Sequence, residues 1–402
     1  MRRGKTFYFL SCILGLCLMS ESKAQLTYLD HEKLVLVKES IRDNSKEYLP
    51  AYQNLLKQAD RALMEGPFSV MQKKQVAASA DKHDYLSLAP YWWPDPEKED
   101  GLPWIRKDGI VNPMTKGEDV DDPVKDRMFN NVKVLSLAYF FAVKRRYAKK
   151  IKQLLKVWFL DKRTRMNPNL NYAQGIPGKN TGRGFGIIEF SGVVHIITAI
   201  EILEMHNNMP KQMDIALKAW LKDYLSWLQT SEFGVFEKSR PNNHGSLHDV
   251  QLVSLLLFLE KTDEAKIVLK SVFEQRIALQ IEPDGSQPHE LKRTKGLTYS
   301  ILNLSALTKL VFYGKRLGVE LWERTSKEGD LQKAYDFLYP YLDDTSIWPY
   351  EQLGDMKKAR ERLRRMFVNS GSMLGISNYC DIGPQLIQVT DIQQLLYPCI
   401  IP

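Results

Sequence analysis

The most constraining feature of this sequence is a helical spacing of apolar residues that recurs along nearly the whole chain. Apolar side chains three or four positions apart form one face of a helix, whereas the alternation typical of strands is rare here. Short polar turns separate most of these segments, which indicates antiparallel neighbours. The chain is therefore predicted to be all-α and built from helical hairpins. The predicted helices are 29–42, 47–64, 128–147, 149–160, 187–206, 211–229, 246–260, 263–280, 296–317 and 328–341.

Stacked hairpins can form a bundle, an open solenoid or a closed α/α toroid. The helical segments are too many for one simple bundle, and no repeat of fixed period supports a solenoid. The helical pattern breaks at 81–124, 166–186 and 281–296, which are rich in proline, glycine and polar residues. Long loops in a compact domain are usually functional, because sites are built from loops on a rigid scaffold. No linker is evident, so one domain is expected.

The first residues read as an export signal. Positive residues precede an apolar run at 7–19, and 22–24 offers a small-x-small cleavage site. The run is short for a membrane span, and no other segment is expected to span a membrane. We therefore expect a signal peptide at 1–24 and a secreted or periplasmic protein of residues 25–402. A buried first helix, or a lipoprotein attached through Cys17, are the alternatives.

The cysteines bear on the cellular compartment of the protein, and the net charge bears on the class of its binding partner. Cys380 and Cys399 remain after the leader, and an exported chain can join them or leave them as thiols. The formal net charge is +8, and removal of the leader, with four basic residues and one acidic, leaves about +5. A basic protein suits nucleic acid, anionic lipid or an acidic polysaccharide. Without a nucleic-acid motif the polysaccharide is favoured, although a generic basic surface explains the charge equally well.

The sharpest polar cluster is Ser239–Gln251, which contains Asn242, Asn243, His244 and His248. His244 stands at the start of a predicted helix, where the helix dipole favours the neutral imidazole that a general base needs. Asn243 offers an amide donor, although either asparagine can instead cap the helix. The two histidines are four residues apart, as in zinc sites, but no clear third ligand accompanies them. No metal or cofactor is therefore expected, and His248 is interpreted as a packed or supporting residue near the substrate.

A second cluster, Asp284–Ser300, brings Arg293 and Tyr299 near the start of another predicted helix. Ionising the tyrosine at pH 7 costs about 4 kcal/mol, and a nearby guanidinium would offset part of that. A buried tyrosine with a satisfied hydroxyl is the alternative. Three further polar residues of this cluster are candidate substrate contacts: Gln287, His289 and Glu290.

Two further loops carry candidate sugar contacts. Consecutive aromatic residues can stack on sugar rings or pin a loop to the core. Glycines let the backbone approach a ligand, and basic residues among them can bind carboxylates. The candidates are Tyr91, Trp92 and Trp93 in the first loop, Lys179 and Arg183 in the second, and His195 just beyond it.

At these clusters the chain resembles the alginate lyase superfamily of helical-toroid polysaccharide lyases. The matching stretches are YLSLAPYWWPDP, GRGFGIIEF, RPNNHGSLHDVQ and DGSQPHELKRTKGLTYSILNL. The resemblance implies an all-α toroid of about six or seven hairpins with a substrate groove or tunnel. It implies that Asn243 and Arg293 neutralise a uronate carboxylate and that His244 and Tyr299 handle protons. Ser246 and Leu247 depart from the family, where many relatives carry an aromatic residue.

The expected function is β-elimination of alginate or a related polyuronate by a monomeric enzyme. A glucuronan lyase, a glycoside hydrolase and a non-catalytic acidic-glycan-binding protein are the alternatives. A hydrolase needs two carboxylates that flank the scissile bond, and Glu189, Glu282 and Glu290 are the candidates for that pair.

Overall fold

A computed structural model describes residues 25–44, 46–327, 329–382 and 390–400. The predicted signal peptide, 1–24, lies outside the described residues. The helices are α1 His31–Arg42, α2 Leu49–Leu63, α3 Asp122–Ala142, α4 Arg145–Leu155, α5 Val193–Met205, α6 Lys211–Thr230, α7 Glu232–Lys238, α8 Asn243–Phe258, α9 Thr262–Val272, α10 Ala278–Gln280, α11 Pro288–Leu291, α12 Gly296–Leu317, α13 Leu331–Leu338, α14 Met356–Leu374, α15 Ser377–Cys380 and α17 Gln393–Leu396. The strands are short: β1 Leu86–Leu88, β2 Trp92–Trp93, β3 Ile105–Arg106 and β4 Tyr172–Gly175.

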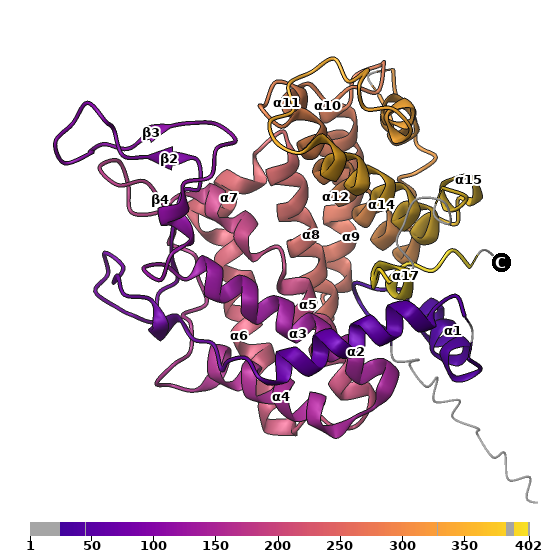
Figure 1. Ribbon diagram of the computed structural model, residues 1–402, viewed down its shortest axis with the longest axis horizontal. Coiled ribbons are helices and arrows are strands. Elements are labelled where there is room, and N and C mark those ends of the chain that lie inside the picture. Colours follow the sequence, from indigo (N-terminus) through magenta and orange to yellow (C-terminus); the bar gives the residue numbers. More distant parts are fainter. Residues whose placement is uncertain (1–24, 45, 328, 383–389, 401–402) are drawn as a thin grey trace, which may run out of the picture.

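The helices lie in two layers (Figure 1). Within the inner layer α3, α5, α8, α12 and α14 contact one another in succession, while α2 and α4 pack on α3, α6 packs on α8, and α9 packs on α8 and α12. Helix α8 is almost wholly buried, and its buried residues include polar side chains near its start as well as the apolar run that follows. The prediction of an all-α chain is confirmed.

Several helix boundaries differ from the prediction, and the end of α3 is one of them. The segment 128–147 was expected to be continuous, but α3 ends at Ala142 because Val143 adopts a left-handed conformation, with its N–H bonded to the Tyr139 carbonyl. Apolar periodicity continues through this turn, because both helices bury residues against the same core, and so periodicity alone does not reveal the break.

The larger of two clusters of buried apolar residues in the described ranges runs from Leu26 to Leu396, and the smaller consists of Ala89, Trp104 and Ile176. The stretch Gly184–Met205 is long and apolar enough to cross a membrane by length and composition, which the sequence reading had not anticipated. Most of it, 72% of the test window, is buried inside the structure. Burial of this kind is typical of a core helix. Near the end of the chain a disulfide joins Cys380 to Cys399 and settles the pairing that the sequence left open.

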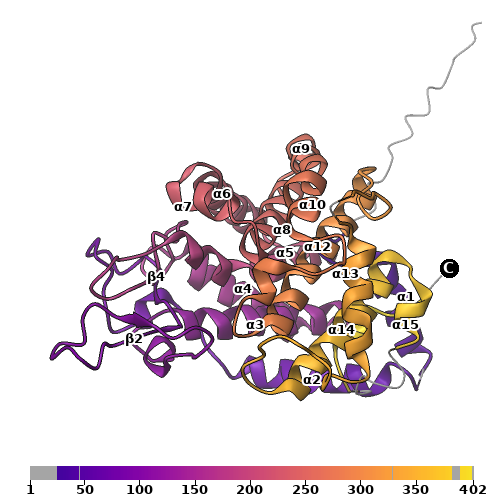
Figure 2. The ribbon, with the colours of Figure 1, turned by 90° about the horizontal axis from the view of Figure 1, so that it is seen from above.

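The strands gather at one end of the long axis. Strand β1 pairs with β4 in parallel, and β2 pairs with β3 antiparallel. Figures 1 and 2 both place β2 and β4 at this end, whereas α1 and α15 lie at the other. The first two long polar loops therefore lie together at this end of the helical scaffold.

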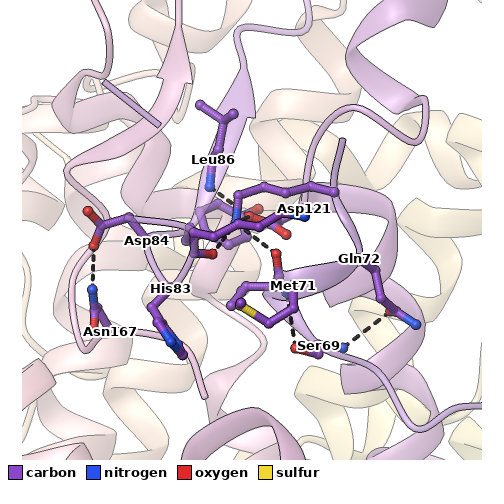
Figure 3. A network of polar contacts seen from close by, with 12 residues as sticks. Ser69, Met71, Gln72, His83, Asp84, Leu86, Asp121 and Asn167 are labelled. Carbon is purple, nitrogen blue, oxygen red and sulfur yellow. Dashed lines mark hydrogen bonds and ion pairs between the residues drawn. The ribbon is translucent and has the colours of Figure 1, made fainter. Parts of the chain in front are cut away.

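A buried ion pair fixes the base of these loops. Lys73 and Asp121 lie 3.0 Å apart with no exposed side-chain surface, and the Leu86 N–H donates to Asp121 at 2.8 Å. Figure 3 shows this network, in which Asn167 of the second loop also donates to Asp84 of the first. The two loops are thus tied to each other and to the helices, which gives the site a rigid base.

Candidate active site

The loops and the first turns of α8 and α12 enclose a cavity of about 390 Å³, called here the loop cavity. It is lined by Pro90, Tyr91, Trp92, Arg106, Gln174, Arg183, Phe185, Ile188, Asn243, His244, Arg293 and Tyr299. Asn243, His244, Arg293 and Tyr299, predicted from two separate clusters, therefore share one cavity. Among the described residues that line it there is no aspartate or glutamate.

The start of α8 presents Asn243 and His244. The Asn242 side chain is the N-cap and accepts a hydrogen bond from the His244 N–H, so the capping interpretation holds for Asn242. Asn243 is buried, and its backbone N–H and side-chain Nδ2 donate to the two oxygens of Glu290 at 2.6 and 2.7 Å. Burial raises the pKa of Glu290, although these hydrogen bonds oppose the shift. Glu290 thus fixes the direction in which the Asn243 amide points.

A buried carboxylate also holds His244. Its Nδ1 lies 2.6 Å from Oε1 of Glu237, whose side chain is almost wholly buried, while the imidazole keeps 15% of its surface exposed. A carboxylate at Nδ1 favours the tautomer with the proton there, which leaves Nε2 as a free acceptor. Phe185 contacts the same ring edge-on, with centroids 4.9 Å apart. Sequence reasoning missed Glu237, because an acidic residue on a short preceding helix gives no spacing signal.

Arg293 is held by a third carboxylate. Its Nε and Nη2 donate to the two oxygens of Asp108 at 3.1 and 2.8 Å. Burial alone would raise the pKa of Asp108, but bonds to Arg293 and Arg106 outweigh burial and lower it. Asp108 stands in the first polar loop and was not predicted. The Asp-Gly pair at 108–109 predicts a turn, but it does not indicate that Asp108 pairs with Arg293.

Tyr299 lies between Arg293 and Tyr91. Its hydroxyl is 2.7 Å from the Tyr91 hydroxyl and 3.3 Å from Nη2 of Arg293, whose guanidinium lies 4.4 Å from the Tyr299 ring centroid. Burial is the largest influence on the pKa of Tyr299 and raises it, and the Arg293 charge only partly opposes the rise. Tyr299 is therefore a neutral phenol that can donate a proton.

The remaining predicted loop contacts divide between the cavity and its rim. Arg183 lines the cavity and donates to Gln174 at 2.7 Å, and burial lowers its pKa to about 10, so it stays charged at neutral pH. Trp92 lines the cavity, with the Lys179 ammonium 4.4 Å from its ring centroid. Trp93 is not part of the lining and donates from Nε1 to the Ile110 carbonyl.

Besides Asn242, Lys179 and Trp93, five predicted contacts fall outside the cavity lining. Gln287 and Glu290 are buried, where Gln287 accepts from Asn303 and Glu290 accepts from Asn243, so neither side chain lines the loop cavity. His248 is buried against Asp249, which Arg276 also binds. His195 lines a different cavity. His289 is partly exposed beside Lys292.

The loop cavity does not contain the carboxylates that the glycoside hydrolase alternative requires. Glu189 is held by Tyr85 and Ser87, Glu290 is buried, Glu282 is exposed, and none of the three lines the cavity. Within the described ranges no three His, Cys, Asp or Glu side chains are grouped as metal ligands. The cavity instead offers three arginine side chains, those of Arg106, Arg183 and Arg293, beside the amide, imidazole and phenol named above.

Comparisons with known proteins agree with this geometry. The family model described as alginate lyase matches residues 69–348, while no curated protein gives a significant match. An alginate lyase from Bacteroides ovatus is 38% identical, with a TM-score of 0.88 over 93% of this chain and 98% of that one. Alginate lyase A1-III from Sphingomonas species A1 is 17% identical, with a TM-score of 0.54 over 87% and 95% of the two chains, and shares the fold.

The α/α toroid expected from the sequence is thus confirmed. Because the family model covers well over half of the chain and the B. ovatus enzyme matches it nearly end to end, the chain belongs to the alginate lyase family of polysaccharide lyases.

Proposed function

We propose that this enzyme cleaves alginate, or a closely related polyuronate, by β-elimination in the loop cavity. One observation carries the proposal: an amide, an imidazole, a guanidinium and a phenol converge on one cavity whose described lining contains no carboxylate. A lining without acidic groups suits a polyanion. It also lacks the pair of acids that hydrolysis requires.

The first task of the site is to stabilise charge. The C5 proton of a uronate lies next to a carboxylate, so its removal adds negative charge to a group that is already charged. Donors placed at that group favour the transition state, and one such donor is typically worth about 10²–10³ in rate. Asn243 and Arg293 fill this role, because Glu290 and Asp108 already fix their directions.

The second task is proton transfer. Tyr299, the phenol, protonates the leaving O4. In a syn elimination, as for mannuronate, Tyr299 first loses its proton to solvent, a loss that the Arg293 charge favours; the phenolate then takes the C5 proton and passes that proton to O4. In an anti elimination, as for guluronate, His244 accepts the proton at Nε2 from the other face of the ring.

A substrate panel tests the proposal. Polymannuronate, polyguluronate, glucuronan and a neutral glucan are incubated with the enzyme, and unsaturated products are followed by ultraviolet absorbance. We expect absorbance to rise with at least one polyuronate and not with the glucan. Saturated reducing ends in place of unsaturated ones would contradict the proposal, and the most rapidly cleaved polymer identifies the uronate.

We also propose that the protein is exported after cleavage at residue 24 and acts as a monomer. The disulfide between Cys380 and Cys399 supports export, because such bonds persist in oxidising compartments. N-terminal sequencing of the protein from the periplasm or medium tests the cleavage site. Light scattering on a sizing column tests the monomer.

A further inference from the structure

A second cavity, of about 220 Å³, lies between helices α3, α5 and α14. Residues near Tyr28 and helix α17 complete its wall, and it shares no lining residue with the loop cavity. Its volume corresponds to roughly seven water molecules at ~30 Å³ each. That is below the ~300–1,000 Å³ of sites for drug-sized ligands. An occupant would therefore be a small molecule.

Lys133 brings an uncompensated positive charge into this second cavity. It lines the cavity from α3, and within the described ranges its ammonium has neither a hydrogen bond nor a salt bridge. Asp391 is the acidic group that acts on it, but Arg365 binds that carboxylate at 2.7 Å. Burial lowers the pKa of Lys133, as expected for a cation without a partner.

Other charged groups nearby strengthen this imbalance. Lys309 is buried beside Tyr28, where its ammonium donates to the Tyr28 carbonyl and lies 4.2 Å from the ring centroid. Arg316 donates to the carbonyls of Leu26 and Thr27. The acids in the same region are engaged: Glu201 accepts from Thr27, and Asp30 caps α1. The buried cations therefore lack free carboxylate partners.

The rest of the lining is neutral and suited to a ring with hydroxyl groups. Burial lowers the pKa of His195 well below its usual value, with Lys133 and Lys309 adding to the shift, so this imidazole is neutral. The Asn369 amide and the Thr198 hydroxyl also line the cavity, and Tyr28 and Tyr397 supply aromatic surface. An inorganic anion would leave these groups without a role.

We propose that the second cavity binds a small organic carboxylate of about the size of one sugar acid, with its carboxylate on Lys133 and its hydroxyl groups on Asn369, His195 and Thr198. This site is separate from the lyase reaction and does not rest on it. The aromatic rings of Tyr28 and Tyr397 pack against the carbon skeleton of the ligand.

Calorimetric titration of the full-length enzyme tests the site. The probes are D-glucuronate, D-glucose, which has the ring without the carboxylate, and inorganic phosphate, which has the charge without the ring. We expect glucuronate to bind wild type and Arg293→Ala alike, because Arg293 lies in the loop cavity. Lys133→Met should weaken binding at least tenfold, as expected for loss of a charge-assisted hydrogen bond. Polyuronate cleavage by Lys133→Met should stay unchanged.

Asn369→Leu is the second variant and guards against a folding defect in Lys133→Met. It should weaken glucuronate binding about two- to tenfold, which corresponds to one neutral hydrogen bond. Binding that survives Lys133→Met, or is lost in Arg293→Ala, would overturn the proposal, as would no binding at all. Phosphate that binds as tightly as glucuronate would show a site for inorganic anions and would also overturn it.

Discussion

The two cavities of this enzyme differ in whether their polar side chains have carboxylate partners. In the loop cavity three of the four groups assigned to the reaction have a carboxylate behind them: Glu237 for His244, Glu290 for Asn243 and Asp108 for Arg293. In the second cavity Lys133 has no such partner among the described residues. A carboxylate partner fixes the direction in which a reacting side chain points, and a reaction needs that fixed geometry. A cation without such a partner can instead pair with the charge of a ligand.

The largest effect on this comparison should come from Tyr299→Phe. The change removes the proton donor and leaves the ring beside Arg293, so turnover should fall by about 10²–10⁴ on every substrate while binding persists. Initial rates by ultraviolet absorbance and affinity by calorimetry measure the two quantities. Tyr91→Phe removes only the hydroxyl partner and should lose less. Retained turnover in Tyr299→Phe would exclude the phenol as the acid.

Asn243→Ala should follow, with a loss of about 10²–10³ in kcat/KM on polyuronates, because a donor to the developing charge is removed. Glu290→Gln is the matched control, since it alters the support of the amide without removing it, and its loss should be smaller. Thermal unfolding of both variants separates this effect from a folding defect. Equal losses in the two would mean that Asn243 acts through the fold alone.

Glu237→Gln tests whether the carboxylate behind His244 matters to the reaction. A glutamine amide can donate to Nδ1 and favour the wrong tautomer, so kcat on polyguluronate should fall about ten- to hundredfold with KM nearly unchanged. Glu237→Asp keeps an acceptor and should retain more activity than Glu237→Gln. If kcat and KM change together in both variants, Glu237 supports the fold and does not position His244.

Lys309→Met, near the second cavity, should have the smallest effect on catalysis. It should have the clearest effect on how the free energy of unfolding depends on pH. Burial lowers the pKa of Lys309 to about 7. Its pKa in the unfolded chain is about 10.4. Between these values the unfolded chain binds more protons, so this lysine makes the folded state more stable as pH rises.

The difference in unfolding free energy between wild type and Lys309→Met should therefore change in favour of wild type by up to about 1.4 kcal/mol per pH unit over this window. Denaturant unfolding at pH 7, 8 and 9 measures the change. Lys315→Met, on the exposed side of the same helix, should show no such trend. A flat difference for Lys309→Met would mean that its ammonium is well solvated or paired.

The sequence predicted the scaffold and the groups that face the loop cavity better than their supports. The helices could be predicted because burial of one helix face produces a periodic apolar pattern. The groups that face the loop cavity could be predicted because a histidine, an arginine or a tyrosine follows recognisable turn residues. The role of Asp108 could not be predicted, because its partner Arg293 is 185 residues away in the sequence. Gln287 and Glu290 were predicted as substrate contacts, but in the structure both turn inward and accept hydrogen bonds from the buried amides of Asn303 and Asn243, a direction that sequence does not show.

The contacts across the loop cavity join distant parts of the chain. Tyr91 and Tyr299 are 208 residues apart, and Asp108 and Arg293 are 185 apart. Contacts of such long range form late, because a large segment of chain must first be ordered between them. During refolding, helical circular dichroism should therefore recover before lyase activity, and a nascent chain should remain inactive until residues near 300 have docked against the first loop.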